Sequence, residues 1–221
     1  FKTGAVGAVG VDALAREDAT TMAVIGSGKQ ARGQVLASVT VRNFRDIRVY
    51  SPTPDHREAF AADIAQEVGP NVTTAGTASE AVADADVVIT ATRATEPVFD
   101  GEDLPAGAHV TAMGQYAPGK RELDATTIAR AKYVPDLRKR AFRDAGAFLQ
   151  AMEAGVVSDN HVHAELGDVV AGRLPGRESP DDITVFDSGG TAIETVAAAD
   201  LLYRRAREAG RGTPIEFTSS M

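Results

Sequence analysis

The sequence predicts an α/β fold built on a doubly wound parallel sheet, and two observations carry this prediction. Short β-branched apolar runs of strand length alternate along the chain with Ala-rich segments that have charged faces. Strands that alternate with helices in this way form parallel sheets covered by helices on both faces. A glycine-rich turn, Gly26-Ser-Gly28, also follows the first apolar run and precedes a helical segment, as in many doubly wound sheets.

Each element is expected from its own local pattern. The expected strands are the apolar runs Thr21–Ile25, Ile47–Tyr50, Val72–Thr74, Val87–Thr90 and His109–Ala112. The expected helices are Gly4–Ala15, Gln30–Val41, Asp55–Val68 and Thr191–Ala209. The first and last helices either link the sheet to another part of a longer protein or cover one sheet face. We therefore expect a linking helix in residues 1–20, the sheet domain in residues 21–186, and a return helix and C-terminal tail in residues 187–221.

The composition excludes several classes of function. The 221 residues are 43% hydrophobic and 24% charged, which is ordinary for a folded globular domain. The absence of cysteine excludes disulfides, thiolate zinc sites and thiol catalysis. The sequence has no apolar run of about 18 residues, the length needed to span a membrane. We therefore expect no membrane partner and a cytoplasmic location. The net charge of −8 argues against nucleic-acid binding, which needs a cationic surface.

The balance of charged residues has two explanations. Only five of the 23 basic residues are lysines, and carboxylates are in excess. Such a surface is typical of a halophilic source, but a GC-rich genome also replaces Lys by Arg. The sequence leaves both explanations open.

The turn after the first strand has the features of a phosphate-binding loop. Gly26 permits a tight turn, and Gly28 has no Cβ, so a pyrophosphate can approach the backbone. The following helix directs its free N–H groups at that anion, and Ala31 allows close packing of the helix on the strand. This context predicts a dinucleotide-binding domain. The cofactor-binding residues expected in the loop are Gly26, Ser27, Gly28, Lys29 and Gln30.

The end of the second strand favours NADP slightly over NAD. Ser51 stands where NAD-binding proteins have a carboxylate for the ribose 2′-hydroxyl. The hydroxyls of Ser51 and Thr53 could bind a 2′-phosphate, and Arg57 could neutralise it. Alternatively, Arg57 is a solvated residue in the first turn of the next helix.

Small residues follow the fourth strand. Thr90, Ala91 and Thr92 would let a cofactor ribose lie over the carboxyl ends of the strands, where ligands bind in open α/β sheets. Alternatively, these residues only form a turn.

Several motifs, in the correct order, resemble the ornithine cyclodeaminase/mu-crystallin family, which includes alanine dehydrogenases and ketimine reductases. The glycine loop continues as Lys29-Gln30-Ala31, similar to the family's Gly-x-Gly-x-Gln-Ala. A second signature resembles Pro-Gly-Lys-x-Glu-Leu. The matching segments are Lys2–Ala5, Gly26–Ala31, Pro118–Leu123, Ala164–Gly167, Ala171–Arg173, Gly176–Arg177, Ile183–Gly190 and Ala192–Glu194.

The resemblance implies an NAD(P)-dependent oxidoreductase that acts on an amino acid or its imine, in the manner of an alanine dehydrogenase or ketimine reductase. Two alternatives remain: an ornithine cyclodeaminase with bound NAD, and a cofactor-binding protein without turnover, as mu-crystallin can be. Family members are typically homodimers with a substrate and dimerisation portion at the N-terminus. The chain starts at Phe1 rather than Met, so we expect that this portion precedes it in a longer protein.

The resemblance also implies roles for individual residues. Lys2 would bind the substrate carboxylate together with upstream residues. Further cofactor contacts would come from Thr3, Met113, Gly114, Ser188 and Gly189.

Two positions depart from the family pattern. Tyr116 stands where the cyclodeaminases have the Asp that moves protons; a phenol has a pKa near ~10, so it is a different acid/base or only packs on the nicotinamide. Lys2 replaces an Arg, and a point charge binds a carboxylate less well than a guanidinium fork does.

Three other features have simple interpretations. His161 and His163 are two residues apart, but they are expected in a loop before a helix, so we expect no metal site. Ser188 is expected to cap the last helix. The basic run Arg138-Lys-Arg140 is expected to be a solvated helix face.

Overall fold

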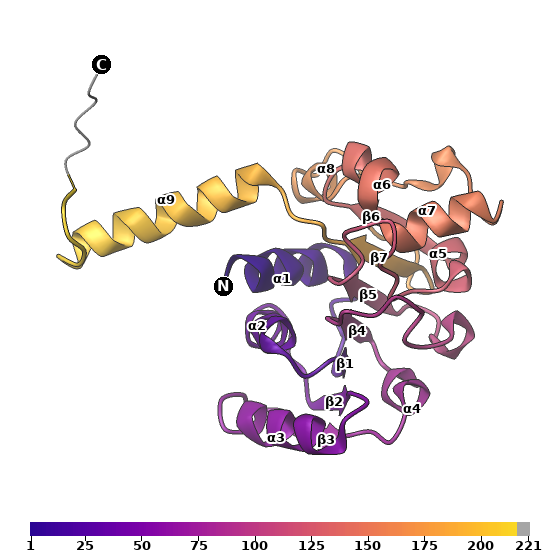
Figure 1. The fold of residues 1–221 in the computed structure, drawn as a ribbon, viewed down its shortest axis with the longest axis horizontal. Helices are drawn as coiled ribbons and strands as arrows, with labels where there is room; N and C mark the ends of the chain where they lie inside the picture. Colours follow the sequence, from indigo (N-terminus) through magenta and orange to yellow (C-terminus); the bar gives the residue numbers. More distant parts are fainter. Residues whose placement is uncertain (216–221) are drawn as a thin grey trace. The chain divides into compact units, whose positions relative to one another are not determined.

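A computed structural model describes residues 1–215 of the chain (Figure 1). These residues fall into two compact units. The first unit comprises Phe1 and residues 3–190, and the second comprises Lys2 and the residues from Thr191 onward. None of the described helices is long and apolar enough to cross a membrane.

The first unit is built on one parallel sheet. In the described residues it has seven strands, in the order β3-β2-β1-β4-β5-β7-β6. From β1 the chain adds β2 and β3 on one side and then crosses over to place β4 on the other side of β1. Strand order therefore reverses between β1 and β4. The strands are β1 Thr21–Ile25, β2 Asp46–Tyr50, β3 Asn71–Thr74, β4 Val87–Thr90, β5 His109–Ala112, β6 Ala131–Pro135 and β7 Ile183–Asp187.

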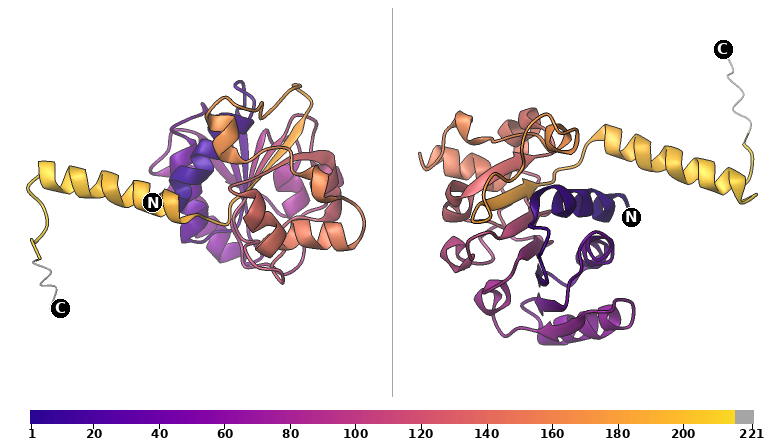
Figure 2. Two further views of the ribbon diagram at one scale, coloured as in Figure 1. Left: turned by 90° about the horizontal axis from the view of Figure 1, so that it is seen from above. Right: turned by 180° about the vertical axis from the view of Figure 1, so that it is seen from behind.

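Helices cover both faces of this sheet (Figures 1 and 2). Helices α1, α2 and α3 lie on one face, and α4, α5 and α7 lie on the other. The helices are α1 Lys2–Leu14, α2 Lys29–Ser38, α3 Pro54–Ala65, α4 Ala78–Val82, α5 Ala125–Arg130, α6 Arg138–Asp144, α7 Gly146–Glu153, α8 Leu166–Val170 and α9 Ala192–Glu208. Short 3₁₀ turns occur at Gly101–Asp103 and Asp159–His161.

The alternation of side chains along the strands explains the two apolar cores. In β1, Met22 and Val24 face the core under α2 and α3, whereas Ala23 and Ile25 face the core under α4 and α7. Because both faces are covered, the central strands β1, β4, β5 and β7 are almost continuously buried. The predicted doubly wound α/β fold is thus confirmed.

The observed elements follow the expected ones closely, with small differences at their ends. Helices α2 and α3 end at Ser38 and Ala65, three residues before the expected ends. Beyond them the backbone tightens, since Val41 N and Glu67 N donate to carbonyls three residues back, Ser38 O and Ile64 O. Strand β6 was not expected from the sequence. It carries Lys132 and Pro135, and it tolerates them because it is an edge strand of the sheet.

The second unit contains helix α9. Thr191 caps this helix: its hydroxyl accepts a hydrogen bond from Glu194 N, and Glu194 Oε2 accepts one from Thr191 N. This is a capping box. The expectation that Ser188 caps the helix was wrong, because a turn through Gly190, with φ +84°, separates Ser188 from the N-cap residue Thr191.

His109 is a neutral side chain buried in the sheet. Its Nδ1 lies 2.9 Å from Thr184 Oγ1, and its Nε2 lies 3.0 Å from Thr111 Oγ1. Thr184 Oγ1 donates to Leu14 O, so Nδ1 of His109 is the donor in the first contact. Burial, aided by the charges of Arg177 and Arg42, lowers the pKa of His109 to about 3.

We expect this histidine to make the protein sensitive to mild acid. The unfolded chain binds a proton at His109 near pH 6.5 whereas the folded chain does not, so stability falls as the pH drops below that value. The loss is about 2 kcal/mol between pH 6.5 and pH 5, at about 1.4 kcal/mol per pH unit. Urea unfolding of His109→Gln at both pH values should show a smaller difference than the native chain. His56→Gln, at an exposed position, should show the same loss of unfolding free energy between the two pH values as the native chain. An equal loss in all three proteins would contradict this account.

Candidate cofactor-binding site

The glycine loop has the backbone that its sequence predicts. Gly26 has φ +118°, which side-chain-bearing residues rarely adopt, and a Cβ there would lie 2.5 Å from Ala91 O. Gly28 has φ −94° and is the N-cap of α2, with no side-chain cap. A Cβ on Gly28 would meet nothing within 4 Å. The start of α2 therefore faces open space, and its free N–H groups can bind a pyrophosphate.

The parallel register brings three loops together at the carboxyl edge of the sheet. Gly26 N donates to Tyr50 O at 2.8 Å, and Ala91 N donates to Ile25 O at 2.9 Å. The loops that follow β1, β2 and β4 are thus neighbours at the point where strand order reverses. This is the position at which open α/β sheets bind ligands.

The loop after β2 gathers the residues considered for the 2′ position. Ser51 is buried, and its hydroxyl accepts a hydrogen bond from Ser27 Oγ at 3.1 Å. Thr53 is exposed and precedes α3. Arg57 Nη1 donates to Ser51 O at 3.1 Å, and the buried Arg57 Nε has no hydrogen-bond partner in the described structure. Arg57 folds back onto the end of β2, so it is not the solvated residue that the alternative interpretation assumed.

A buried carboxylate joins the loops after β4 and β5. Glu122 Oε1 accepts hydrogen bonds from Thr92 N at 2.6 Å and Thr92 Oγ1 at 2.7 Å. Its Oε2 accepts from Thr90 Oγ1 at 2.8 Å and from the backbone N–H groups of Met113 and Gly114 at 3.2 and 2.6 Å. We call these five contacts the Glu122 clamp. It fixes Thr90, Thr92, Met113 and Gly114, all residues that the sequence assigned to the cofactor.

The contacts of Glu122 fit an ionised carboxylate and leave no room for a side chain at position 114. Burial raises the pKa of Glu122, while hydrogen bonds from Thr92, Gly114 and Thr90 act in the opposite direction. Backbone N–H groups can only donate, and they reach both carboxylate oxygens, as an ionised Glu122 requires. Gly114 is obligatory, because a Cβ there would lie 2.5 Å from the Glu122 carboxyl carbon.

A second buried polar cluster holds the turn after β7. Arg140 Nε donates to Asp136 Oδ1 at 2.7 Å, and Arg140 Nη2 donates to Asp187 Oδ1 at 2.5 Å. Asp136 Oδ2 accepts from Gly189 N and Gly190 N at 2.9 and 2.5 Å. We call Asp136, Arg140 and Asp187 the Arg140 cluster. Burial alone would lower the pKa of Arg140, but the charges of Asp187 and Asp136 raise it further above its ordinary value.

The Arg140 cluster corrects the expectation for the basic run at residues 138–140 and explains why position 189 is a glycine. Arg140 is only 4% exposed, so the basic run is not a uniformly solvated helix face. Gly189 belongs to the predicted set of cofactor-binding residues, and a Cβ on it would lie 2.3 Å from Arg140 Cδ. Ser188, also predicted, is buried, and its backbone N–H donates to Ala112 O at 3.0 Å. The turn thus lies beside the end of β5.

The remaining predicted residues have varied positions. Tyr116 follows Gln115 in the loop after β5, and its side chain is 54% exposed. Thr3 lies in α1, and its carbonyl accepts from Gln34 Nε2 on α2 at 2.9 Å. Lys29 and Gln30 are exposed in the first turn of α2. Lys2 is grouped with the second unit, in which its Nζ lies 3.2 Å from Glu194 Oε2.

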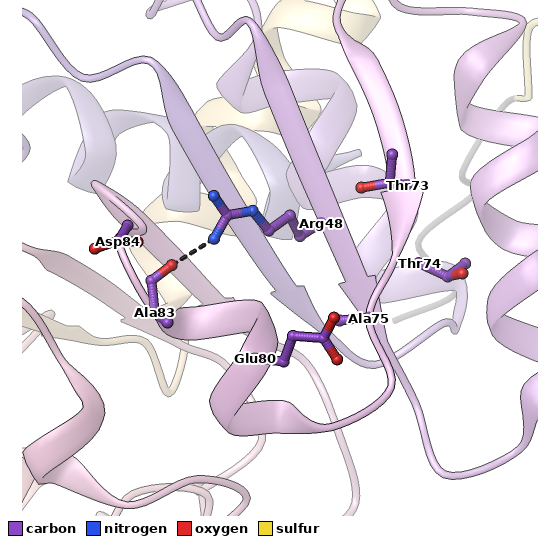
Figure 3. A pocket seen from close by; sticks show the side chains of 7 residues that line it. All are labelled: Arg48, Thr73, Thr74, Ala75, Glu80, Ala83 and Asp84. Atoms are coloured by element: carbon purple, nitrogen blue, oxygen red, sulfur yellow. Dashed lines mark hydrogen bonds between the residues drawn. The ribbon is translucent and has the colours of Figure 1, made fainter.

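A cavity of about 340 Å³ lies elsewhere, beside α4 (Figure 3). Its lining includes both signs of charge, from Arg48, Glu80 and Asp84. Arg48 Nη1 donates to Ala83 O at the C-terminal end of α4, and Glu80 Oε2 accepts from Gly76 N just before its N-terminal end, so both side chains are engaged by the ends of α4. The cavity does not include the glycine loop.

Sequence reasoning missed the roles of Glu122, Gln115 and the Arg140 cluster. Glu122 had one signal, its place in the Pro-Gly-Lys-x-Glu-Leu segment. Asp136 and Arg140 are four residues apart, but ion pairs at that spacing are common on exposed helix faces, so the spacing gave no sign of burial.

Comparisons with known proteins identify relatives of this chain. Delta(1)-pyrroline-2-carboxylate reductase from Bacillus cereus is 37% identical over 218 residues, which cover 98% of this chain and 67% of the relative. The structure of the Thermococcus litoralis Delta(1)-pyrroline-2-carboxylate reductase in complex with NADH and L-proline matches with a TM-score of 0.94 and 37% identity, over 97% of this chain and 66% of that one. An archaeal alanine dehydrogenase dimer with bound NAD matches with a TM-score of 0.91 and 33% identity, again over 97% and 66%.

This chain spans about two thirds of the length of these relatives. The model of the ornithine cyclodeaminase/mu-crystallin family matches residues 1–210, which include every motif on which the resemblance was based. The chain belongs to the ornithine cyclodeaminase/mu-crystallin family.

Proposed function

We propose that this chain is the cofactor-binding part of an NAD(P)-dependent oxidoreductase that acts on an amino acid or its imine. The observation that carries the proposal is the open end of α2 behind Gly26 and Gly28, at the point where strand order reverses. The names of the relatives support the reaction class, because they include a Delta(1)-pyrroline-2-carboxylate reductase and an alanine dehydrogenase. A small cyclic or open-chain imino acid is the proposed substrate class.

The residues of this chain would bind and orient the cofactor, whose nicotinamide supplies or accepts the hydride. The N–H groups at the start of α2 bind the pyrophosphate, and Thr90 to Thr92 support a ribose. Met113, Gly114 and Ser188 border the nicotinamide. Tyr116 is exposed beside them, and it either moves a proton to the substrate nitrogen or packs on the nicotinamide ring. Lys2 and residues outside this chain would bind the substrate carboxylate.

Two other functions remain open within the family. An ornithine cyclodeaminase would borrow the hydride, return it and release ammonia, but Tyr116 replaces its acidic residue. A protein of the mu-crystallin kind would bind the cofactor without turnover. We also propose a homodimer for the whole protein, since the archaeal alanine dehydrogenase is described as a dimer.

Absorbance and binding measurements separate these functions. A reductase oxidises NADH when Δ1-pyrroline-2-carboxylate is added, so the absorbance at about 340 nm falls. A cyclodeaminase releases ammonia from ornithine with no net change in that absorbance. A binding protein gives neither signal. The assay should use the whole protein, and NADH titration should be repeated on this chain. If neither the whole protein nor this chain binds NADH or NADPH, the proposal is refuted.

The loop after β2 supports a modest preference for NADP, although the related structures contain NADH and NAD. The guanidinium of Arg57 donates to the backbone carbonyl of Ser51 there, and the first carboxylate after β2 is Asp55, in the first turn of α3. A charge-assisted bond to a 2′-phosphate contributes about 1.5–3 kcal/mol, which is one to two decades of affinity at about 1.4 kcal/mol per decade.

Ser51→Asp should reverse this preference. The new carboxylate repels a 2′-phosphate and accepts a hydrogen bond from a 2′-hydroxyl, so NADPH affinity should fall about tenfold or more while NADH affinity is kept or improved. Fluorescence titration with both reduced cofactors measures this change. Ser51→Asn, which removes the hydroxyl without adding charge, should weaken the preference but not reverse it. Tighter NADH binding by the native chain would contradict the NADP preference.

A further inference from the structure

Gln115 connects the two buried polar groups of the site. Its Nε2 donates to Asp187 Oδ2 at 2.7 Å, and its Oε1 accepts from Glu122 N at 3.4 Å. Its own carbonyl accepts from Gly146 N at the start of α7 at 3.0 Å. The side chain is only 1% exposed, so these contacts are shielded from water. Gln115 thus touches the Glu122 clamp, the Arg140 cluster and a helix.

The connected groups follow the order of the strands. The Glu122 clamp joins the ends of β4 and β5, Gln115 lies in the loop after β5, and the Arg140 cluster joins the ends of β7 and β6. These four strands are adjacent in the sheet. A continuous row of buried hydrogen bonds therefore runs beneath the loops that carry Thr92, Met113 and Ser188.

The chemistry of this position requires a neutral amide. Asp187 Oδ2 accepts from Tyr133 Oη at 2.7 Å and from Gln115 Nε2, while Glu122 N needs an acceptor on the other side. An amide has a donor at one end and an acceptor at the other, so both contacts are satisfied in one orientation only. A carboxylate would face Asp187 with no proton between them. An apolar side chain would leave Glu122 N without its acceptor and would remove one of the two donors, the other being Tyr133 Oη, from Asp187 Oδ2.

We propose that Gln115 is a positioning residue that fixes the nicotinamide end of the site by holding the loops after β5 and β7 in register. It acts through the backbone of Met113 to Tyr116 and through the Asp187 turn, and it does not touch the cofactor. This inference rests on the proposed function, because it concerns where the nicotinamide lies. The adenosine end, at Gly26 and Ser51, is built from other loops and is independent of Gln115.

Binding of two ligands tests the proposal on this chain. Gln115→Met should lower NADH affinity about tenfold but leave ADP-ribose affinity within about twofold, since ADP-ribose lacks the nicotinamide. Gln66→Met, the same change at the exposed C-cap of α3, should alter neither affinity. Equal losses for both ligands would show a general structural role and overturn the proposal, as would unchanged NADH affinity. If the native chain binds neither ligand, the proposed function itself is wrong.

Hydrogen exchange of the free chain gives a second readout that does not depend on a cofactor. Gln115→Met should speed amide exchange in residues 113–123 and 187–190 and leave residues 24–32 unchanged. Faster exchange throughout the sheet would overturn the proposal.

Gln115→Glu adds a pH signature. The introduced carboxyl would lie against Asp187 and the backbone N–H of Glu122, and Asp187 is in turn bonded to Tyr133 and Arg140, which holds Asp136. The nearby carboxylate of Asp187 favours the protonated form of the new group, and the cation of Arg140, one residue further away, opposes it. Protonated, it regains a donor for Asp187. NADH affinity of this variant should therefore recover as the pH falls from about 8 to about 6, within the range that buried carboxyl groups can reach. Gln115→Met should show no such recovery; a variant that binds NADH equally well at both pH values would contradict the role of the donor.

Discussion

Gly28→Val should lower dinucleotide affinity about 100-fold and leave the fold intact. The branched side chain would occupy the open space at the start of α2, where the pyrophosphate must approach the backbone. Loss of two charge-assisted hydrogen bonds, about 3 kcal/mol together, corresponds to an affinity about 100-fold lower. The fold should tolerate the change, because Gly28 has an extended backbone that any residue adopts and its Cβ would touch nothing.

Calorimetric titration with NADH and NADPH measures the loss of affinity, and thermal unfolding measures the stability of the fold. The change in stability should stay below about 1 kcal/mol, the scale of an N-cap substitution. Gly69→Val is a matched control, because a Cβ there also meets open space and the position lies outside the loop. Native affinity in Gly28→Val would remove the glycine loop from the site.

Arg140→Met should cause a large loss of stability, about 3–5 kcal/mol. The guanidinium is the counter-charge of Asp136 and Asp187, whose side chains are only 2% and 1% exposed. Methionine can fill the space, but it leaves two buried carboxylates facing each other without a cation. A hydrophobic replacement of the whole cluster could be harmless, whereas removal of one member is not.

Arg143→Met is the matched control for this prediction. Arg143 lies one turn further along α6, is 70% exposed and pairs with Asp144 at the surface. Its loss should change the free energy of unfolding by less than about 1 kcal/mol, as for other exposed ion pairs. Urea unfolding at neutral pH compares the two variants. Similar stabilities would mean that the Arg140 cluster is not a buried charge network.

Much of the fold could be predicted from the sequence, and the reasons are local. The glycine turn is specified by the backbone that Gly26 must adopt, and the central strands are specified by their apolar runs. Strand β6 could not be found in this way, because Lys132 and Pro135 interrupt its pattern and its position at the sheet edge is a property of the assembled sheet.

The polar framework of the site depends on contacts between distant residues. Tyr133 and Asp187 are 54 residues apart, and Glu122 reaches residues 8 to 32 positions away. No spacing along the chain indicates such contacts, so Arg140 looked like a solvated side chain. The cofactor-contacting residues that the sequence motifs indicate stay a prediction, whereas the buried residues that hold their loops were found only in the structure.

The Glu122 clamp has a consequence for how this family changes its chemistry. Three of its five hydrogen bonds come from backbone N–H groups, which any residue other than proline provides. The shape of the loops is therefore set independently of most of the side chains that they carry. Position 116, where this chain departs from the family pattern, lies outside the clamp. A site built in this way can exchange one acid/base group for another over evolutionary time while its cofactor stays in place.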